Sequence, residues 1–114
     1  MAALPETTIT TVLALQRRLL AIIDRATATE MLIFDNYGET ETTLIALNDL
    51  HNFQERADTY YSLFYTLLRQ IASSQPIANP ALLELLHRSI DDAEATSNAL
   101  EATIQEEKRN FNIP

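Results

Sequence analysis

Residues 50–71 read LHNFQERADTYYSLFYTLLRQI, and this stretch decides the fold of the chain. One row of its apolar residues recurs at alternating gaps of three and four, which is the spacing of an α-helix that buries one side. The row consists of Leu50, Phe53, Ala57, Tyr60, Phe64, Leu67 and Ile71. In the second half of the stretch, large side chains occupy nearly every side of such a helix. We therefore expect a central helix that is covered by at least two neighbours.

Rows with the same spacing occur before and after this stretch. The earlier row consists of Val12, Leu15, Leu19, Ile22, Ala26, Thr29 and Ile33, and it is widened by Leu13, Leu20, Ile23 and Phe34. The later row consists of Leu83, Leu86, Ile90, Ala93, Ser97, Leu100 and Ile104. On the central helix the row begins further back, with Leu44 and Leu47. Each row predicts one long helix, so the chain should contain three.

The breaks between the helices have recognisable signals. Gly38 is the only glycine, and it stands where a helix end needs a residue that tolerates positive φ. Thr40, one of three threonines near this turn, is a candidate N-cap for the second helix. Pro76 ends that helix, and Asn79 followed by proline starts the third.

At the N-terminus, Pro5 before Glu6 fits the first turn of a helix, with Thr7 or Thr8 as alternative N-caps. The predicted helices cover about residues 6–35, 40–73 and 80–108. The fold prediction is all-α: an elongated up-down-up bundle of three long antiparallel helices in one domain, residues 1–114, with completion by dimerisation left open.

The pairing of the helices is also predicted. Aligning the two turns brings Arg17 and Arg18 level with Asp91 and Asp92. It brings Arg25 level with Glu101.

Composition excludes several classes of function. Eight basic residues face sixteen acidic ones, a net charge of −8, which argues against binding to nucleic acid or to an anionic membrane surface. The densest apolar run, Leu19–Ile23, is far shorter than the ~20 residues of a membrane span. There is no cysteine, which removes disulfides and thiolate metal ligands but does not fix the compartment. No basic segment precedes an apolar run at the N-terminus, so we expect a cytoplasmic protein.

Two carboxylate–histidine pairs are the main candidates for a metal or small-ligand site. Glu84 and His87 have the Glu-x-x-His spacing by which ferritin-like bundles present two ligands. His51 and Glu55 share a helix face. A site of the ferritin type needs two such units and two further glutamates, so surface histidines beside solvated acids are the simpler interpretation.

The aromatic residues favour an interaction surface. Tyr60 and Phe64 belong to the predicted core, whereas Tyr61, Tyr65 and Leu68 form an apolar strip with hydroxyl tips, which is typical of an interface. Because no catalytic motif or cofactor-binding loop is present, we predict a non-enzymatic protein–protein interaction module without a cofactor. The expected partners are an unidentified protein and a second copy in a homodimer. The alternative is a metal- or small-ligand-binding bundle, with possible enzymatic activity, that uses Glu84, His87, His51 and Glu55.

Overall fold

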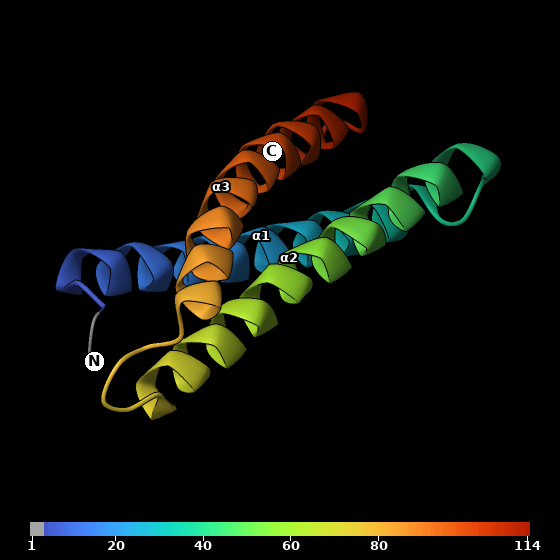
Figure 1. The fold of residues 1–114 in the computed structure, drawn as a ribbon. Coiled ribbons are helices and arrows are strands. Elements are labelled where there is room, and N and C mark those ends of the chain that lie inside the picture. The colour runs from blue at the N-terminus through green and yellow to red at the C-terminus, as the bar shows by residue number, and fades with distance from the viewer. Residues whose placement is uncertain (1–3) are drawn as a thin grey trace.

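The computed structural model describes residues 4–114, which form three long α-helices. They are α1 (Glu6–Tyr37), α2 (Glu41–Ser73) and α3 (Pro80–Asn110). The helices run up, down and up along a molecule of 57 × 19 × 17 Å (Figure 1). The predicted all-α, elongated three-helix bundle is thus confirmed. Within residues 4–114, no helix carries an apolar stretch that would allow it to cross a lipid bilayer.

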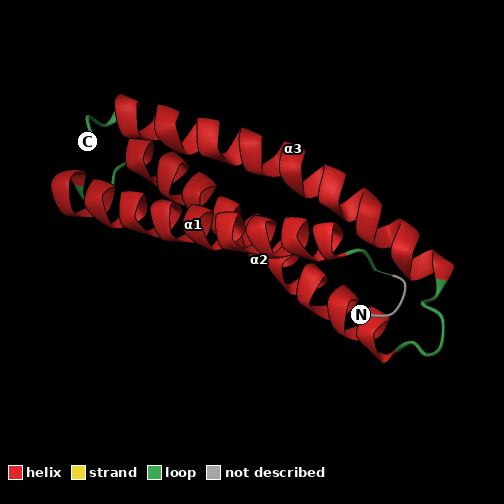
Figure 2. Cartoon of the chain, turned by 90° about the vertical axis from the view of Figure 1, so that its left-hand side faces the viewer, coloured by secondary structure: helices red, strands yellow, loops and turns green. Residues whose placement is uncertain are grey.

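The helices do not contribute equally to the bundle. α1 and α2 pack against each other more extensively than either packs against α3. α3 lies along one side of this pair and crosses it at an angle (Figures 1 and 2). The opposite side of the α1–α2 pair therefore has no third helix over it.

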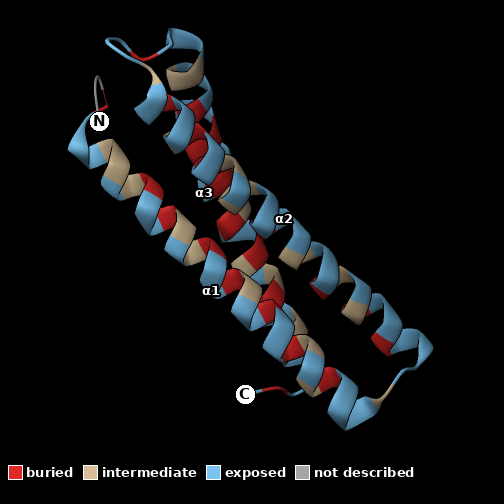
Figure 3. Ribbon diagram, turned by 90° about the horizontal axis from the view of Figure 1, so that it is seen from below, coloured by how far each residue is buried: buried red, intermediate tan, exposed pale blue. Residues whose placement is uncertain are grey.

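The three predicted rows supply the core. Figure 3 shows buried residues along the sides where the helices face one another. The fully buried side chains include Val12, Leu19, Ile22, Leu50, Ala57, Phe64, Ile71, Leu86, Ala93 and Leu100. Tyr60 and Phe53 are only half-buried and pack against this core from its edge. The alternating gaps of three and four therefore predicted most of the main seam, which is the row of buried residues along which the helices pack.

The turn between α1 and α2 is held by local hydrogen bonds. Gly38 has φ 68°, a conformation that residues with a Cβ rarely adopt, and its N–H donates to the carbonyl of Phe34 at 2.8 Å. Thr40 is the N-cap of α2, because its hydroxyl accepts from the Thr43 N–H at 3.1 Å. The Thr43 hydroxyl accepts from the Thr40 N–H at 2.7 Å, which completes a capping box.

The end of α3 is closed by a Schellman motif. Asn112 has φ 54°, and the N–H of Ile113 donates to the carbonyl of Lys108 at 2.7 Å. This turn buries Ile113 and directs Phe111 toward α1. The rings of Phe111 and Tyr37 meet edge to face, 5.6 Å apart, and the Tyr37 hydroxyl donates to the Phe111 carbonyl at 2.9 Å. The C-terminal tail thereby fastens α3 to the end of α1.

The helix boundaries are close to the predicted ones. Asn79 caps α3 through a 2.8 Å hydrogen bond from the Ala81 N–H, as its position before proline suggests. α1 and α3 each extend two residues further than predicted. Neither Thr7 nor Thr8 is the cap of α1, because the helix starts at Glu6 with Pro5 in the N-cap position.

The predicted level of α3 against α1 was wrong by about two turns. Arg18 donates to the Glu101 carboxylate, with Nε–Oε2 at 3.1 Å, and it also donates to the side chain of Asn98. Asp91 and Asp92 are exposed, and neither forms an ion pair with another residue of the described range 4–114. The prediction assumed that α3 starts level with the end of α2. The six residues between the two helices begin and end with extended backbone, so α3 starts at a different level.

Ser97 carries the one buried side-chain polar atom without a hydrogen-bond partner in residues 4–114. Because an unpaired buried hydroxyl costs free energy, we expect Ser97→Ala to raise the free energy of unfolding by about 1 kcal/mol. Urea denaturation followed by circular dichroism measures the change. Ser62→Ala, at an exposed site in α2, is the matched control for helix propensity and should give a smaller gain. Equal gains in both variants would contradict the prediction.

Glu107 gives a pH-dependent prediction. Burial, together with the charges of Asp49 and Glu106, raises the pKa of Glu107 above its ordinary value of 4.5. The folded state therefore binds this proton more tightly than the unfolded state does, and the charged carboxylate destabilises the fold. We expect Glu107→Gln to be more stable than the wild type at pH 7. The advantage should shrink as the pH falls through the raised pKa and vanish below 4.5. A difference that is independent of pH would contradict this assignment.

Candidate protein-interaction surface

Several large apolar side chains stand one position after a buried residue of the seam. Leu13, Leu20 and Phe34 on α1 directly follow the buried Val12, Leu19 and Ile33. On α2, Leu44 and Tyr65 follow the buried Thr43 and Phe64 in the same way. Consecutive residues of a helix are ~100° apart, so these five side chains leave the core and are exposed.

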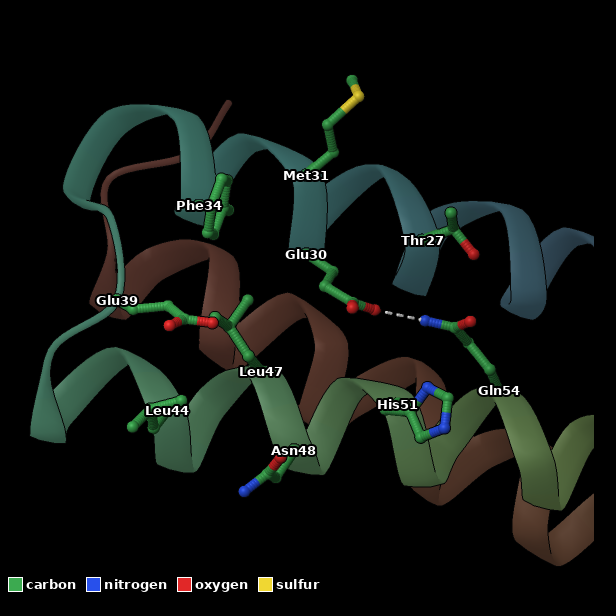
Figure 4. Close-up of a pocket in the computed structure, with 10 residues that line it drawn as sticks. All are labelled: Thr27, Glu30, Met31, Phe34, Glu39, Leu44, Leu47, Asn48, His51 and Gln54. Carbon is green, nitrogen blue, oxygen red and sulfur yellow. Dashed lines mark hydrogen bonds between the residues drawn. The ribbon is translucent and has the colours of Figure 1, made fainter.

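The apolar side chains near the Gly38 turn form a groove between α1 and α2. The groove has a volume of about 600 Å³, and its lining includes Met31 and Phe34 of α1 and Leu44 and Leu47 of α2. Figure 4 looks onto it, with the ribbon of α3 behind the α1–α2 pair. Met31, Phe34 and Leu44 have exposed fractions of 58, 52 and 43%. This groove, which we call the outer groove, is thus apolar and open on the side away from α3.

The charged residues at the edges of the outer groove are acidic. Glu30 accepts a hydrogen bond from the side-chain amide of Gln54 at 2.6 Å, which links the two helices across the groove (Figure 4). Glu39 lines the groove at its turn end, and His51 lines it on α2. His51 Nε2 lies 3.1 Å from the Glu55 carboxylate. The lining contains two carboxylates and no lysine or arginine, so its rim is negative.

The groove belongs to a longer surface. Phe34 and Leu44 line it near the turn, and Thr27 and His51 line it further along the two helices. One step of seven residues further, in opposite directions on the antiparallel helices, Leu20 comes level with Asp58. A second step brings Leu13 level with Tyr65. We call the surface formed by these two rows and by the half-buried residues between them the outer face.

The predicted interface strip lies at the end of the outer face that is far from the turn. Tyr65 is 56% exposed, and the Arg69 guanidinium lies 5.4 Å from the centre of its ring. Tyr61 and Leu68 are half-buried and pack against the core. The backbone carbonyl of Tyr61 also accepts from the Gln16 side chain at 3.3 Å. Tyr65 is thus the main exposed group of the strip, and its role as an interface stays a prediction.

The two carboxylate–histidine pairs are not brought together. His51 lies beside Thr27 of α1, whereas His87 lies beside Thr7 and Thr8. These positions are about 30 Å apart along α1. Glu84 forms an ion pair with Arg88, in which a guanidinium nitrogen lies 3.1 Å from a carboxylate oxygen, and it does not pair with His87. In residues 4–114, no three histidine or acidic side chains are grouped so that they could hold a metal ion.

The outer groove was missed in the sequence. Phe34 and Leu44 were assigned to the buried rows, because both are apolar and lie beside them. The available signal was the spacing: Leu13, Leu20, Thr27 and Phe34 recur at steps of seven, one position after Val12, Leu19, Ala26 and Ile33. This second row shows that the apolar surface of the helix is wide, but it does not show which part of that surface stays uncovered.

Comparisons with known proteins bring no further information. The chain was compared with protein-family models, with curated protein sequences and with solved structures, and nothing matched in any of the three. The outer face and its side chains are therefore the basis for a proposed function.

Proposed function

We propose that the protein is a non-enzymatic protein–protein interaction module that binds its partners through the outer face of α1 and α2. The observation that carries the proposal is the outer groove, in which Met31, Phe34 and Leu44 remain about half exposed between two well-packed helices. Contiguous exposed apolar surface with a polar rim is typical of a binding site for another protein.

The kinds of side chain on this face support the proposal. Phe34, Met31 and Tyr65 belong to residue types that are enriched in the centres of protein interfaces. They stand on helices whose cores are fully packed, so binding would require little ordering of the backbone. Lysine is absent from this face, and the acidic groups Glu30 and Glu39 lie at the rim of the groove.

α3 has a different outward surface. Its exposed positions include Glu84, Asp91, Asp92 and Glu94, and Leu85 is its one large apolar side chain that is exposed in residues 80–110. A charged helix surface of this kind favours solvent. In this proposal α3 covers the inner side of the α1–α2 pair and leaves recognition to the outer face.

The predictions on oligomeric state, location and enzymatic activity belong to the same proposal. A homodimer would use this face, because the strip of Tyr61, Tyr65 and Leu68 is part of it. A cytoplasmic location and the absence of enzymatic activity are also parts of the proposal. The metal- or ligand-binding alternative is not favoured by the positions of His51 and His87.

The interaction proposal is tested by changing the groove. We expect Phe34→Ser combined with Leu44→Ser to keep the helix content, because both side chains are about half exposed. Loss of two apolar anchors should weaken partner binding by about 2 kcal/mol or more, roughly thirtyfold. The measurement is quantitative mass spectrometry of proteins retained from lysate of the source cells by tagged wild type and variant.

The control for this experiment is Leu85→Ser, which removes an exposed apolar side chain from α3. Partners of the outer face should be retained by the wild type and by this control, and lost by the groove variant. Identical sets of proteins on all three baits would contradict the proposal.

The metal-binding alternative gives a separate prediction. Because no group of three candidate ligands exists in residues 4–114, we expect zinc, manganese and ferrous iron to leave the melting temperature unchanged. Thermal unfolding with and without each ion, with elemental analysis of the purified protein, provides the measurement. A stoichiometric metal, or a stabilisation that His87→Ala abolishes, would instead support the alternative.

A further inference from the structure

The outer face has opposite charges at its two ends. Near the Gly38 turn, Glu30 and Glu39 line the groove, and no basic side chain lines it. Glu41 is exposed beside them, at the first residue of α2. At the far end, Arg69 lies over Tyr65, and Arg17 is exposed one helical turn from Leu13. Arg18, by contrast, is turned away to Glu101 on α3. The face therefore carries apolar groups at both ends, is acidic at the turn end, and has two arginines toward the other end, where Glu6 is also exposed. Asp24, Glu55 and Asp58 lie between the ends.

The apolar residues are placed symmetrically along the face. Phe34 and Leu44 mark one end, and Leu13 and Tyr65 mark the other, each pair being level across the two helices. The midpoint between Leu13 and Phe34 on α1 is level with the midpoint between Leu44 and Tyr65 on α2. A surface of this kind can match a reversed copy of itself, apolar end on apolar end.

From this distribution we infer that a second copy of the chain covers the outer face, with its ends reversed, around a two-fold axis perpendicular to the helices. This inference rests on the proposed function and specifies how the two copies of the homodimer are oriented. In this arrangement each α1 packs against the α1 of the partner, and each α2 against the partner's α2. Leu13 then lies opposite the partner's Phe34, and Tyr65 opposite the partner's Leu44.

The same arrangement brings unlike charges together. Arg17 lies four residues after Leu13, and Glu30 lies four residues before Phe34. Because Leu13 faces the partner's Phe34 on an antiparallel helix, Arg17 faces the partner's Glu30. By the same count on α2, Arg69 comes near the partner's Glu41. The two-fold axis forms each of these pairs twice. Complementary charges of this kind set the orientation of an interface more than its affinity.

A dimer with its ends aligned would have the opposite effect. It would place Glu30, Glu39 and Glu41 of one copy against the same three groups of the other, and like charges across an interface are unfavourable. In the reversed arrangement, the acidic groups close to the axis are Asp24, Glu55 and Asp58, and Glu6 comes level with the turn end of the partner. All four side chains are exposed, so water and salt screen them.

The face is large enough for a stable dimer. Its rows run over 21 residues, which is about 32 Å of helix, and two adjacent helices are about 20 Å wide. The footprint is therefore about 640 Å² per copy, or about 1,300 Å² for both, which lies within the range of specific protein interfaces.

Charge reversal tests the inference. Sedimentation equilibrium at low ionic strength should show a dimer for the wild type. Arg17→Glu alone and Glu30→Arg alone should each weaken the dimer at least tenfold. Each variant replaces an attractive pair of charges by a pair of like charges, and the two-fold axis repeats this pair. The double variant, Arg17→Glu with Glu30→Arg, should restore the dimer. Asp92→Arg, on the exposed side of α3, is the matched control and should leave dimerisation unchanged. Circular dichroism checks that every variant keeps its helices.

Cross-linking tests the orientation independently, because the chain has no cysteine of its own. Leu20 and Thr27 face each other across the inferred axis. Leu20→Cys combined with Thr27→Cys should give covalent dimers with a bis-maleimide that reaches the about 8–10 Å between packed helices. Leu20→Cys alone should give few, because its symmetry mate is about 10 Å further along the helix. Efficient cross-linking of the single variant would overturn the reversed orientation.

Self-association can fail while the proposed function holds. A chain that stays monomeric up to about 100 μM overturns the second-copy inference, since interfaces of this size bind more tightly. If the Phe34→Ser, Leu44→Ser variant still fails to retain other proteins that the wild type retains, the interaction function stands, and the occupant of the outer face is a different protein. Loss of those proteins by Glu30→Arg in a monomeric chain would identify a basic segment of another protein as that occupant. Restoration of the dimer by the Arg17→Glu, Glu30→Arg double variant supports the reversed dimer and no other arrangement.

Discussion

The continuous apolar seam between α1 and α2 is the contact on which the rest of the structure depends. Each helix has more than 30 residues, and helices in water gain most of their stability from burying such a face. The seam extends from Val12 and Phe64 to Ile33 and Thr43, all of which are buried. The short turn at Gly38 and Thr40 sets its register, because only three residues separate the end of α1 from the start of α2.

This pairing also creates the outer face. Once Ile33 and Thr43 are buried in the seam, the residues that follow them, Phe34 and Leu44, must lie side by side on the surface. The same relation applies along the seam to Val12 and Phe64, and it produces the exposed Leu13 and Tyr65 at the other end. The proposed binding surface and the core are thus two consequences of one helix pairing, which is why apolar groups appear at both ends of the surface.

Local features of the chain were readable from the sequence because short-range chemistry determines them. Gly38 alone tolerates the positive φ at the turn, and Thr40 and Asn79 supply side-chain oxygens where helices begin. The level of α3 was not readable, because it depends on how six non-helical residues travel between two helices. The exposure of Phe34 was not readable either, since an apolar residue beside a seam is as compatible with a fourth helix as with solvent.

The sequence by itself determined three helices, their order, their ends and the residues of the main seam, because spacing and capping act within a few residues along the chain. Only the tertiary structure decided that Arg18 meets Glu101, and that Tyr61 and Leu68 are half-buried while Phe34, Met31 and Leu44 form an open groove. The physical reason is that exposure depends on which side of the α1–α2 pair α3 covers. That choice follows from packing across the whole bundle, and no local pattern in the chain encodes it.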